Sequence, residues 1–126
     1  MKNGYEGPLY ATPATRDLCD IMLADSAYLQ VQDVRYVNKR RLRQGKNPFE
    51  PLYTPEDIPA VMDAFRPLPY ERPMEIAPGV NLAFKDAGHI LGSAFVQIDV
   101  KEDGQTRRLL FTGDVGRKDM PILADP

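Results

Sequence analysis

The chain has 126 residues, of which 43% are hydrophobic and 27% charged, and its net charge is −2. This balance is that of a globular domain with a modest core, and it excludes a disordered chain and an overall basic nucleic-acid binder. No run approaches the roughly 18 apolar residues of a membrane helix, and the N-terminus lacks a signal-peptide pattern. The single cysteine, Cys19, excludes an internal disulfide and fits a reducing compartment. We therefore expect a cytoplasmic protein, not bound to membrane, in which Cys19 is a small buried thiol.

The first half of the chain predicts a short strand and two helices. A strand over residues 8–12 is followed by Thr12 and Pro13, a typical helix start. The helix can continue to Arg43, with its cations facing solvent. Its apolar face is expected to consist of Leu18, Ile21, Met22 and Leu29, continued by Val34 and Val37.

A second helix is predicted after the turn-rich segment over residues 45–51. Thr54 precedes Pro55, and acidic residues follow, which repeats the start signal of the first helix. Pro67 should end this helix. Its buried stripe is expected to consist of Ile58, Val61, Met62 and Phe65.

The second half of the chain predicts an antiparallel β meander. Extended segments are expected over residues 74–76, 80–84, 94–100 and 107–112, with a hairpin turn over 102–105. Residues 80–84 alternate in the manner of a half-buried strand. The fold class is therefore α/β. We assign residues 1–126 to a single domain, with a strand-plus-helix part up to about residue 68 and a β-rich part from about residue 69.

Two side chains follow predicted strands on glycine-containing loops. His89 lies between Gly88 and Gly92, and Asp114 lies between Gly113 and Gly116. Taken alone, each context favours a residue that only hydrogen-bonds within its turn. Together, an imidazole nitrogen and a carboxylate oxygen suit zinc or a similar metal. We expect the two to lie close together, on the assumption that adjacent strands carry them.

Residues 87–94 (AGHILGSA) and 110–117 (LFTGDVGR) resemble the third and fourth metal motifs of the metallo-β-lactamase superfamily. The amino-acid sequences of these motifs resemble those of the β-CASP group. Within this group they are most similar to the branch related to the cleavage-and-polyadenylation endonuclease, which includes bacterial ribonucleases. Residues 7–18 are similar to the strand and helix that follow the first metal motif, and the helical insert is similar too. The resemblance covers nearly the whole chain and implies part of a four-layer αββα sandwich.

The resemblance also implies a function. It implies hydrolysis of RNA at a pair of zinc ions, with His89 binding one ion and Asp114, the catalytic carboxylate, bridging both. The family's His-x-His-x-Asp-His run is absent and expected before Met1. The capping β-CASP domain and the last metal-binding histidine are expected after Pro126. A catalytic zinc takes about three protein ligands. We therefore expect an internal fragment that binds metal weakly, is inactive alone, and self-associates through unpaired strand edges.

Two other functions stay open. The first is another hydrolase of this fold, such as a thioesterase, against which the long insert between Thr15 and Phe65 argues. The second is a non-catalytic module that binds RNA or protein, which the missing ligands fit. The basic run from Arg35 to Lys46 could follow an RNA backbone, but Tyr36 is its sole aromatic residue. A solvated helix face is the favoured interpretation there, and the same holds for Arg117.

Overall fold

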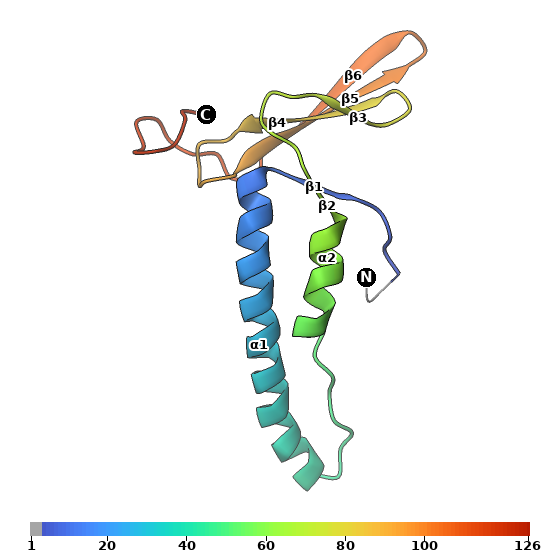
Figure 1. Ribbon diagram of the computed structural model, residues 1–126, viewed down its shortest axis with the longest axis vertical. Coiled ribbons are helices and arrows are strands. Elements are labelled where there is room, and N and C mark those ends of the chain that lie inside the picture. Colours follow the sequence, from blue (N-terminus) through green and yellow to red (C-terminus); the bar gives the residue numbers. More distant parts are fainter. Residues whose placement is uncertain (1–3) are drawn as a thin grey trace. The chain divides into compact units, whose positions relative to one another are not determined.

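The computed structural model describes residues 4–126, which fall into two compact units (Figure 1). Within the described residues, the first unit consists of residues 4–9 and Asp17–Phe65, and the second of Tyr10–Arg16 and Arg66–Pro126. Nowhere between residues 4 and 126 does a helix have the length and apolar character needed to cross a membrane. The assignment of both units to one domain stays a prediction.

The elements follow in the order strand, helices, strands. They are β1 (Leu9–Ala11), α1 (Pro13–Arg43), the 3-10 turn η1 (Pro55–Asp57), α2 (Ile58–Ala64), β2 (Phe65–Pro67), β3 (Met74–Ala77), β4 (Val80–Asp86), β5 (Ala94–Glu102) and β6 (Gln105–Phe111).

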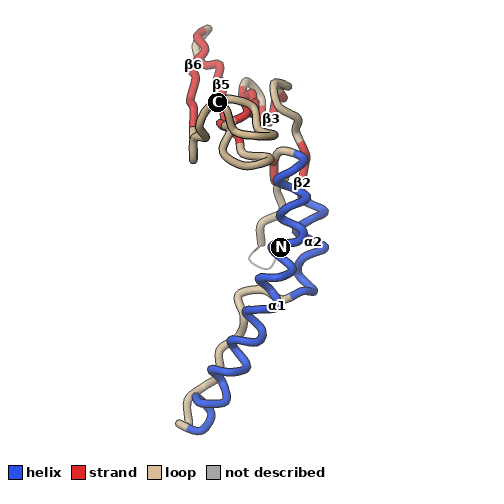
Figure 2. Tube along the Cα trace, turned by 90° about the vertical axis from the view of Figure 1, so that its left-hand side faces the viewer, coloured by secondary structure: helices blue, strands red, loops and turns tan. Residues whose placement is uncertain are grey.

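Helix α1 begins where the sequence predicted. The N–H of Thr15 donates to the Thr12 hydroxyl at 3.2 Å, and the N–H of Arg16 donates to the Thr12 carbonyl at 3.0 Å. Thr12 is therefore the N-cap, and the following proline has no N–H that needs a partner. At the other end, Arg40, Arg41 and Arg43 lie in the last turn, where positive charge is favourable. The 31 residues form one continuous helix (Figure 2).

Apart from Val34, which is half-buried, the predicted apolar face of α1 is wrong. Its residues are exposed: Leu18 by 40%, Ile21 by 70%, Met22 by 60% and Leu29 by 52%. Val37 is exposed too, and Cys19 is half-buried rather than buried. The covered side is the opposite one, formed by Leu23, Ala27, Val31 and Val34. At 100° per residue the helix carries apolar side chains on two opposite faces, and periodicity alone did not distinguish which face is covered within this unit.

The segment after α1 is held against the helix by side chains of the helix itself. The Asn38 amide exchanges two 2.8 Å hydrogen bonds with the backbone of Phe49. Arg41 donates to the Asn47 carbonyl at 2.8 Å, and its guanidinium lies 3.8 Å from the centroid of the Phe49 ring. Among the cations of this region, Arg41 therefore has a structural role.

Helix α2 is shorter than predicted. The predicted start signal lies on the 3-10 turn η1 instead, where the Asp57 carboxylate accepts the N–H of Thr54 at 2.8 Å, and α2 itself begins only at Ile58. At Phe65 the backbone becomes extended, with φ −65° and ψ 136°. Phe65–Pro67 forms β2, which pairs with β1. The residue before a proline is disfavoured in the helical region, so the chain leaves the helix ahead of Pro67.

The second unit contains the predicted antiparallel meander. The sheet has the order β3-β4-β5-β6, and each neighbouring pair is antiparallel. Asp103 and Gly104, both with positive φ, join β5 to β6, as a type I′ hairpin turn requires. A helix followed by this four-stranded sheet confirms the α/β fold class and is consistent with part of a metallo-β-lactamase fold.

The core of this unit lies on one side of the sheet, around Leu68, Leu82 and Phe84. Ala83, between the two β4 core residues, is also buried, at 5% exposure. The predicted alternation of a half-buried strand is therefore wrong for β4, which is covered on both faces. Such a strand is a rigid support for the loop that follows it.

Candidate metal site

The loop that carries His89 is built around the side chain of Ser93. The Ser93 hydroxyl accepts the backbone N–H groups of His89 at 3.1 Å and Ile90 at 3.2 Å. At the end of β4, the Asp86 carboxylate accepts the N–H of Gly88 at 2.8 Å. Gly88 has a φ of +62°, a conformation that side-chain-bearing residues rarely adopt. These contacts fix the backbone on both sides of His89.

A second group of hydroxyls holds the far end of this loop. The hydroxyls of Thr12 and Thr15 lie 2.8 and 2.9 Å from the Gly92 carbonyl oxygen. The Tyr70 hydroxyl donates to the Ser93 carbonyl at 2.9 Å. Burial, and then the Asp86 carboxylate, raise the pKa of Tyr70, so its hydroxyl keeps its proton. Sequence reasoning missed this network, apart from the role of Thr12 as a helix cap.

The segment that carries Asp114 touches the His89 loop through its backbone. The N–H of Gly116 donates to the Ala87 carbonyl at 2.8 Å. A methyl group on Gly116 would overlap the carbonyl of Gly88. The two segments approach so closely that only glycine fits at position 116 without displacement.

The structure brings His89 and Asp114 together, as predicted. His89 Nε2 lies 3.7 Å from Asp114 Oδ2, and the side chains are 45% and 87% exposed. The assumed reason was wrong, because β5 lies between β4 and β6. Since each neighbouring pair is antiparallel, β4 and β6 run in the same direction and end at the same edge of the sheet. Their following segments therefore meet there.

The geometry of the pair fits two ligands of one metal ion. A separation of 3.7 Å is too long for a hydrogen bond. The lone pairs of both groups therefore remain available to a metal ion. Ligands about 2.0–2.2 Å from a tetrahedral zinc lie roughly 3.4 Å apart, so a small adjustment would suffice. Between residues 4 and 126, however, no third histidine, cysteine or acidic residue joins them to form a group of three. Their role as metal ligands stays a prediction.

A hollow of about 320 Å³ lies beside this pair. Its lining consists of Gly88, His89, Val115, Gly116, Arg117 and Met120. The Arg117 guanidinium donates to the Met120 thioether at 3.0 Å, which gives the hollow one positive side chain. An anionic group near His89 would therefore meet a cation.

The amino-acid sequence is similar to those of a ribonuclease and of transcription termination factors. The chain is 36% identical over 126 residues to Ribonuclease TTHA0252 of Thermus thermophilus. It is 34% identical over 110 residues to the transcription termination factor FttA of Thermococcus kodakarensis, and 36% identical over 114 residues to FttA of Methanosarcina mazei. No family model matches the chain.

The similarity spans most or all of this chain but a small part of each relative. It covers 100% of this chain and 24% of the Thermus ribonuclease. For the two FttA proteins it covers 87% and 90% of this chain and 14% and 15% of the relative. The chain therefore spans about a quarter or less of the relatives it matches, and it is the homologue of one segment of these β-CASP metallo-β-lactamase proteins.

Proposed function

We propose that this chain contributes two ligands, His89 and Asp114, to the metal centre of an RNA phosphodiesterase. The observation that carries the proposal is the 3.7 Å separation of the two side chains at one sheet edge. The names of the relatives, a ribonuclease and transcription termination factors, support RNA as the substrate class.

Each residue has a distinct part in this function. A zinc pair, when bound, supplies Lewis acidity toward the phosphodiester. His89 offers a single nitrogen and suits one ion, whereas Asp114 has two carboxylate oxygens and can serve both. Ser93 fixes the backbone from which the His89 imidazole extends. Arg117, on the same hollow, attracts the substrate phosphate.

The first experiment measures metal binding by the chain itself. Substoichiometric Co²⁺ should broaden the NMR signals of the His89 imidazole, and zinc calorimetry should give only weak affinity, because two ligands are too few. Asp114→Asn should abolish the broadening, and both Asp114→Asn and His89→Ala, which removes the only imidazole of the chain, should abolish the weak zinc binding in calorimetry. Asp103→Asn, the same chemical change on the exposed hairpin, is the matched control. Tight zinc binding that is lost in His89→Ala would contradict an incomplete site and indicate completion by other means, such as a dimer.

The second experiment tests the reaction. The matching segment of the Thermus ribonuclease is replaced by this chain, and cleavage of a labelled RNA is followed with zinc present. We expect cleavage by the hybrid and none after His89→Ala or Asp114→Asn, with Asp103→Asn active. A folded, zinc-loaded hybrid that leaves RNA intact would refute the proposal. Hydrolysis of a thioester by that hybrid would favour the other hydrolase class, and RNA binding without hydrolysis would favour a non-catalytic module.

A further inference from the structure

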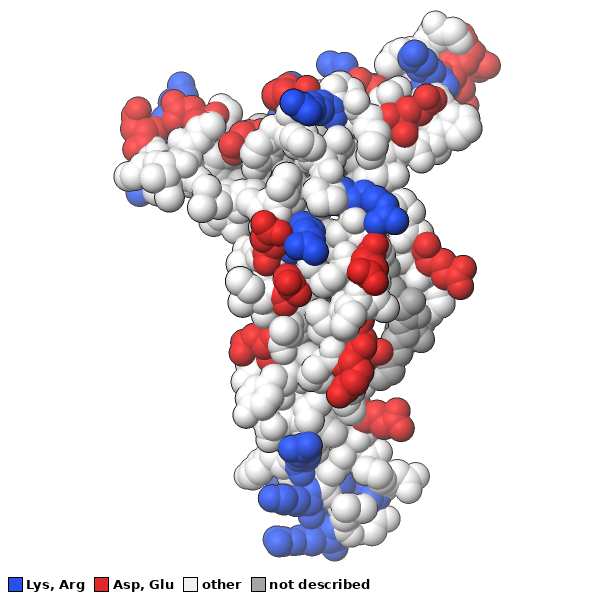
Figure 3. Space-filling model, viewed as in Figure 1, with Lys and Arg blue, Asp and Glu red and all other residues white. Residues whose placement is uncertain are grey.

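The C-terminal end of α1 presents a dense group of cations. Six of the 16 Lys and Arg residues lie between positions 35 and 46, and this stretch contains no Asp or Glu. On the visible face of the molecule, Lys and Arg side chains gather at this end of α1 (Figure 3). Within residues 4–126, none of the six forms an ion pair with a carboxylate. This positive charge is therefore not neutralised by the described part of the chain.

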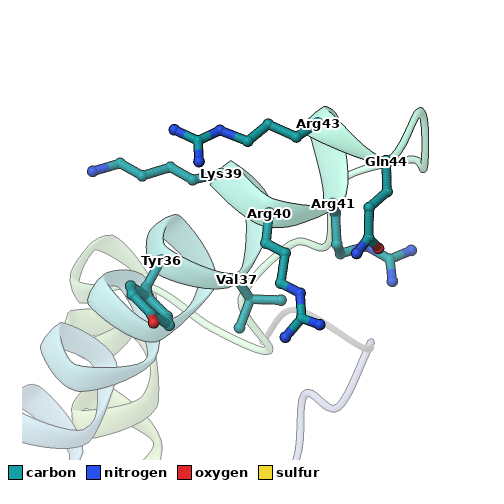
Figure 4. A pocket seen from close by; sticks show the side chains of 7 residues that line it. All are labelled: Tyr36, Val37, Lys39, Arg40, Arg41, Arg43 and Gln44. Atoms are coloured by element: carbon teal, nitrogen blue, oxygen red, sulfur yellow. The ribbon is translucent and has the colours of Figure 1, made fainter.

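Four residues of this group form one surface, which we call the basic tip: Tyr36, Lys39, Arg40 and Arg43. Their spacings of three, four and seven residues place them on one side of the helix, and those three or four residues apart are neighbours at about 5–6 Å. They line a shallow hollow of about 550 Å³ together with Val37, Arg41 and Gln44. The side chains of Lys39 and Arg43 extend in the same direction, and that of Arg40 lies beside Val37 (Figure 4).

Two local roles do not account for the basic tip. The partial negative charge of a helix C-terminus is about half an elementary charge, which one cation satisfies. Arg41 already fixes the following segment through Asn47 and Phe49. Within residues 4–126, Lys39, Arg40 and Arg43 have no such contact, and grouping like charges without a partner costs stability. A bound polyanion would remove that cost.

Tyr36 indicates which polyanion fits. Its side chain is 80% exposed although it lies among the cations. An exposed aromatic ring beside cations is the arrangement that binds single-stranded nucleic acid, because the ring stacks on a base while the cations hold the phosphates. Asp25 and Asp33, on preceding turns of α1, would repel an anionic membrane lying along the helix.

We propose that the basic tip binds single-stranded RNA without sequence preference, through phosphates at Lys39, Arg40 and Arg43 and a base on Tyr36. The proposal rests on the proposed function for its choice of RNA. It adds a binding surface on α1 that is separate from the His89 loop. The sequence alone favoured a solvated helix face in this region, and the proposal differs from that interpretation.

The test is fluorescence anisotropy of a labelled 12-nucleotide oligouridylate with the 126-residue chain, in EDTA and over a series of salt concentrations. One variant combines Lys39→Gln, Arg40→Gln and Arg43→Gln. The matched control combines Arg72→Gln, Lys101→Gln and Arg107→Gln, three exposed cations outside this region. Both variants lower the net charge by three, and circular dichroism verifies that α1 is retained.

We expect the basic-tip variant to bind at least about tenfold more weakly and to lose about 2 from the slope of log K against log salt, since each phosphate contact contributes about 0.7. The control should stay within about twofold of the unaltered chain. Tyr36→Leu should weaken binding at least about fivefold. Replacing Arg40 and Arg43 by Lys should preserve binding, because the charges remain.

Equal losses in the two triple variants, or no RNA binding by the unaltered chain, would overturn the proposal. If the basic-tip variant lost binding to phosphatidylserine vesicles while its RNA affinity stayed unchanged, the proposal would also be overturned and the surface would be assigned to a membrane. Because the assay contains EDTA, it measures RNA binding at the basic tip without a metal ion at His89 and Asp114. Failure of the metal site and failure of the basic tip are therefore distinguishable.

Discussion

The contact between Gly116 and the His89 loop makes a sharp prediction for Gly116→Ala. The φ of Gly116 lies outside the left-handed region, so alanine in open surroundings would stabilise the chain by about 0.4–1 kcal/mol. Here the added methyl overlaps the Gly88 carbonyl. Forcing a methyl into a packed site costs about 1–3 kcal/mol. Losing the 2.8 Å hydrogen bond from Gly116 to Ala87 costs about 0.5–1.5 more. The substitution should therefore lower the free energy of unfolding by roughly 1–4 kcal/mol.

Urea unfolding measures this change, and NMR amide shifts report whether the His89 loop moves. Gly104→Ala is the control, because its methyl would meet no atom within 4 Å and its cost is only that of a positive φ, 73°. It should destabilise by about 1 kcal/mol and leave the His89 amide shift unchanged. If Gly116→Ala were as stable as the unaltered chain, with the His89 amide unshifted, the two segments would not be in the contact described.

The remaining predictions concern the loop and two titrating groups. Ser93→Ala removes the acceptor of two backbone N–H groups and should cost about 1–3 kcal/mol in urea unfolding; an unchanged midpoint would contradict this. Burial, and then Asp86, raise the pKa of Tyr70, so its contribution to stability is full below the ordinary tyrosine value of about 10 and is lost as pH rises through the higher folded value. The fall in stability above about pH 10 should be smaller in Tyr70→Phe. The hydrogen bond from Arg108 lowers the pKa of Asp99. The contribution of this pair to stability is therefore present above the ordinary carboxyl pKa and is lost as pH falls through the lower folded pKa. NMR titration should show the pKa of Asp99 rising in Arg108→Gln, and an unmoved titration would refute the pairing.

The sequence predicted correctly those features that depend on a few neighbouring residues, such as the start of α1 and the β5–β6 hairpin. Thr12 and Pro13 start α1 because capping involves only the first turn, and Asp103 and Gly104 form the hairpin because they tolerate positive φ. His89 and Asp114 were found from their strand-end glycine loops, and the structure brings them together. Their role as metal ligands remains for experiment.

Long-range packing decided the rest. The helix α1 carries two apolar faces, and the sequence pattern could not distinguish the covered face from the exposed one with Leu18 and Met22. Strand β2 pairs with β1, a partner more than 50 residues earlier in the chain that no local pattern in residues 65–67 indicates.

The His89 loop shows the same division between local and tertiary information. Its glycines and Ser93 mark a tight turn in the sequence. The hydroxyl of Thr12 that reaches the Gly92 carbonyl comes from 80 residues away. The meeting of His89 with Asp114 depends on β5 lying between their strands, so that β4 and β6 end at one edge. The sequence alone determined which residues have the chemistry and where the local turns occur. Strand order decided which of these residues meet, because pairing between strands depends on contacts that no local pattern encodes.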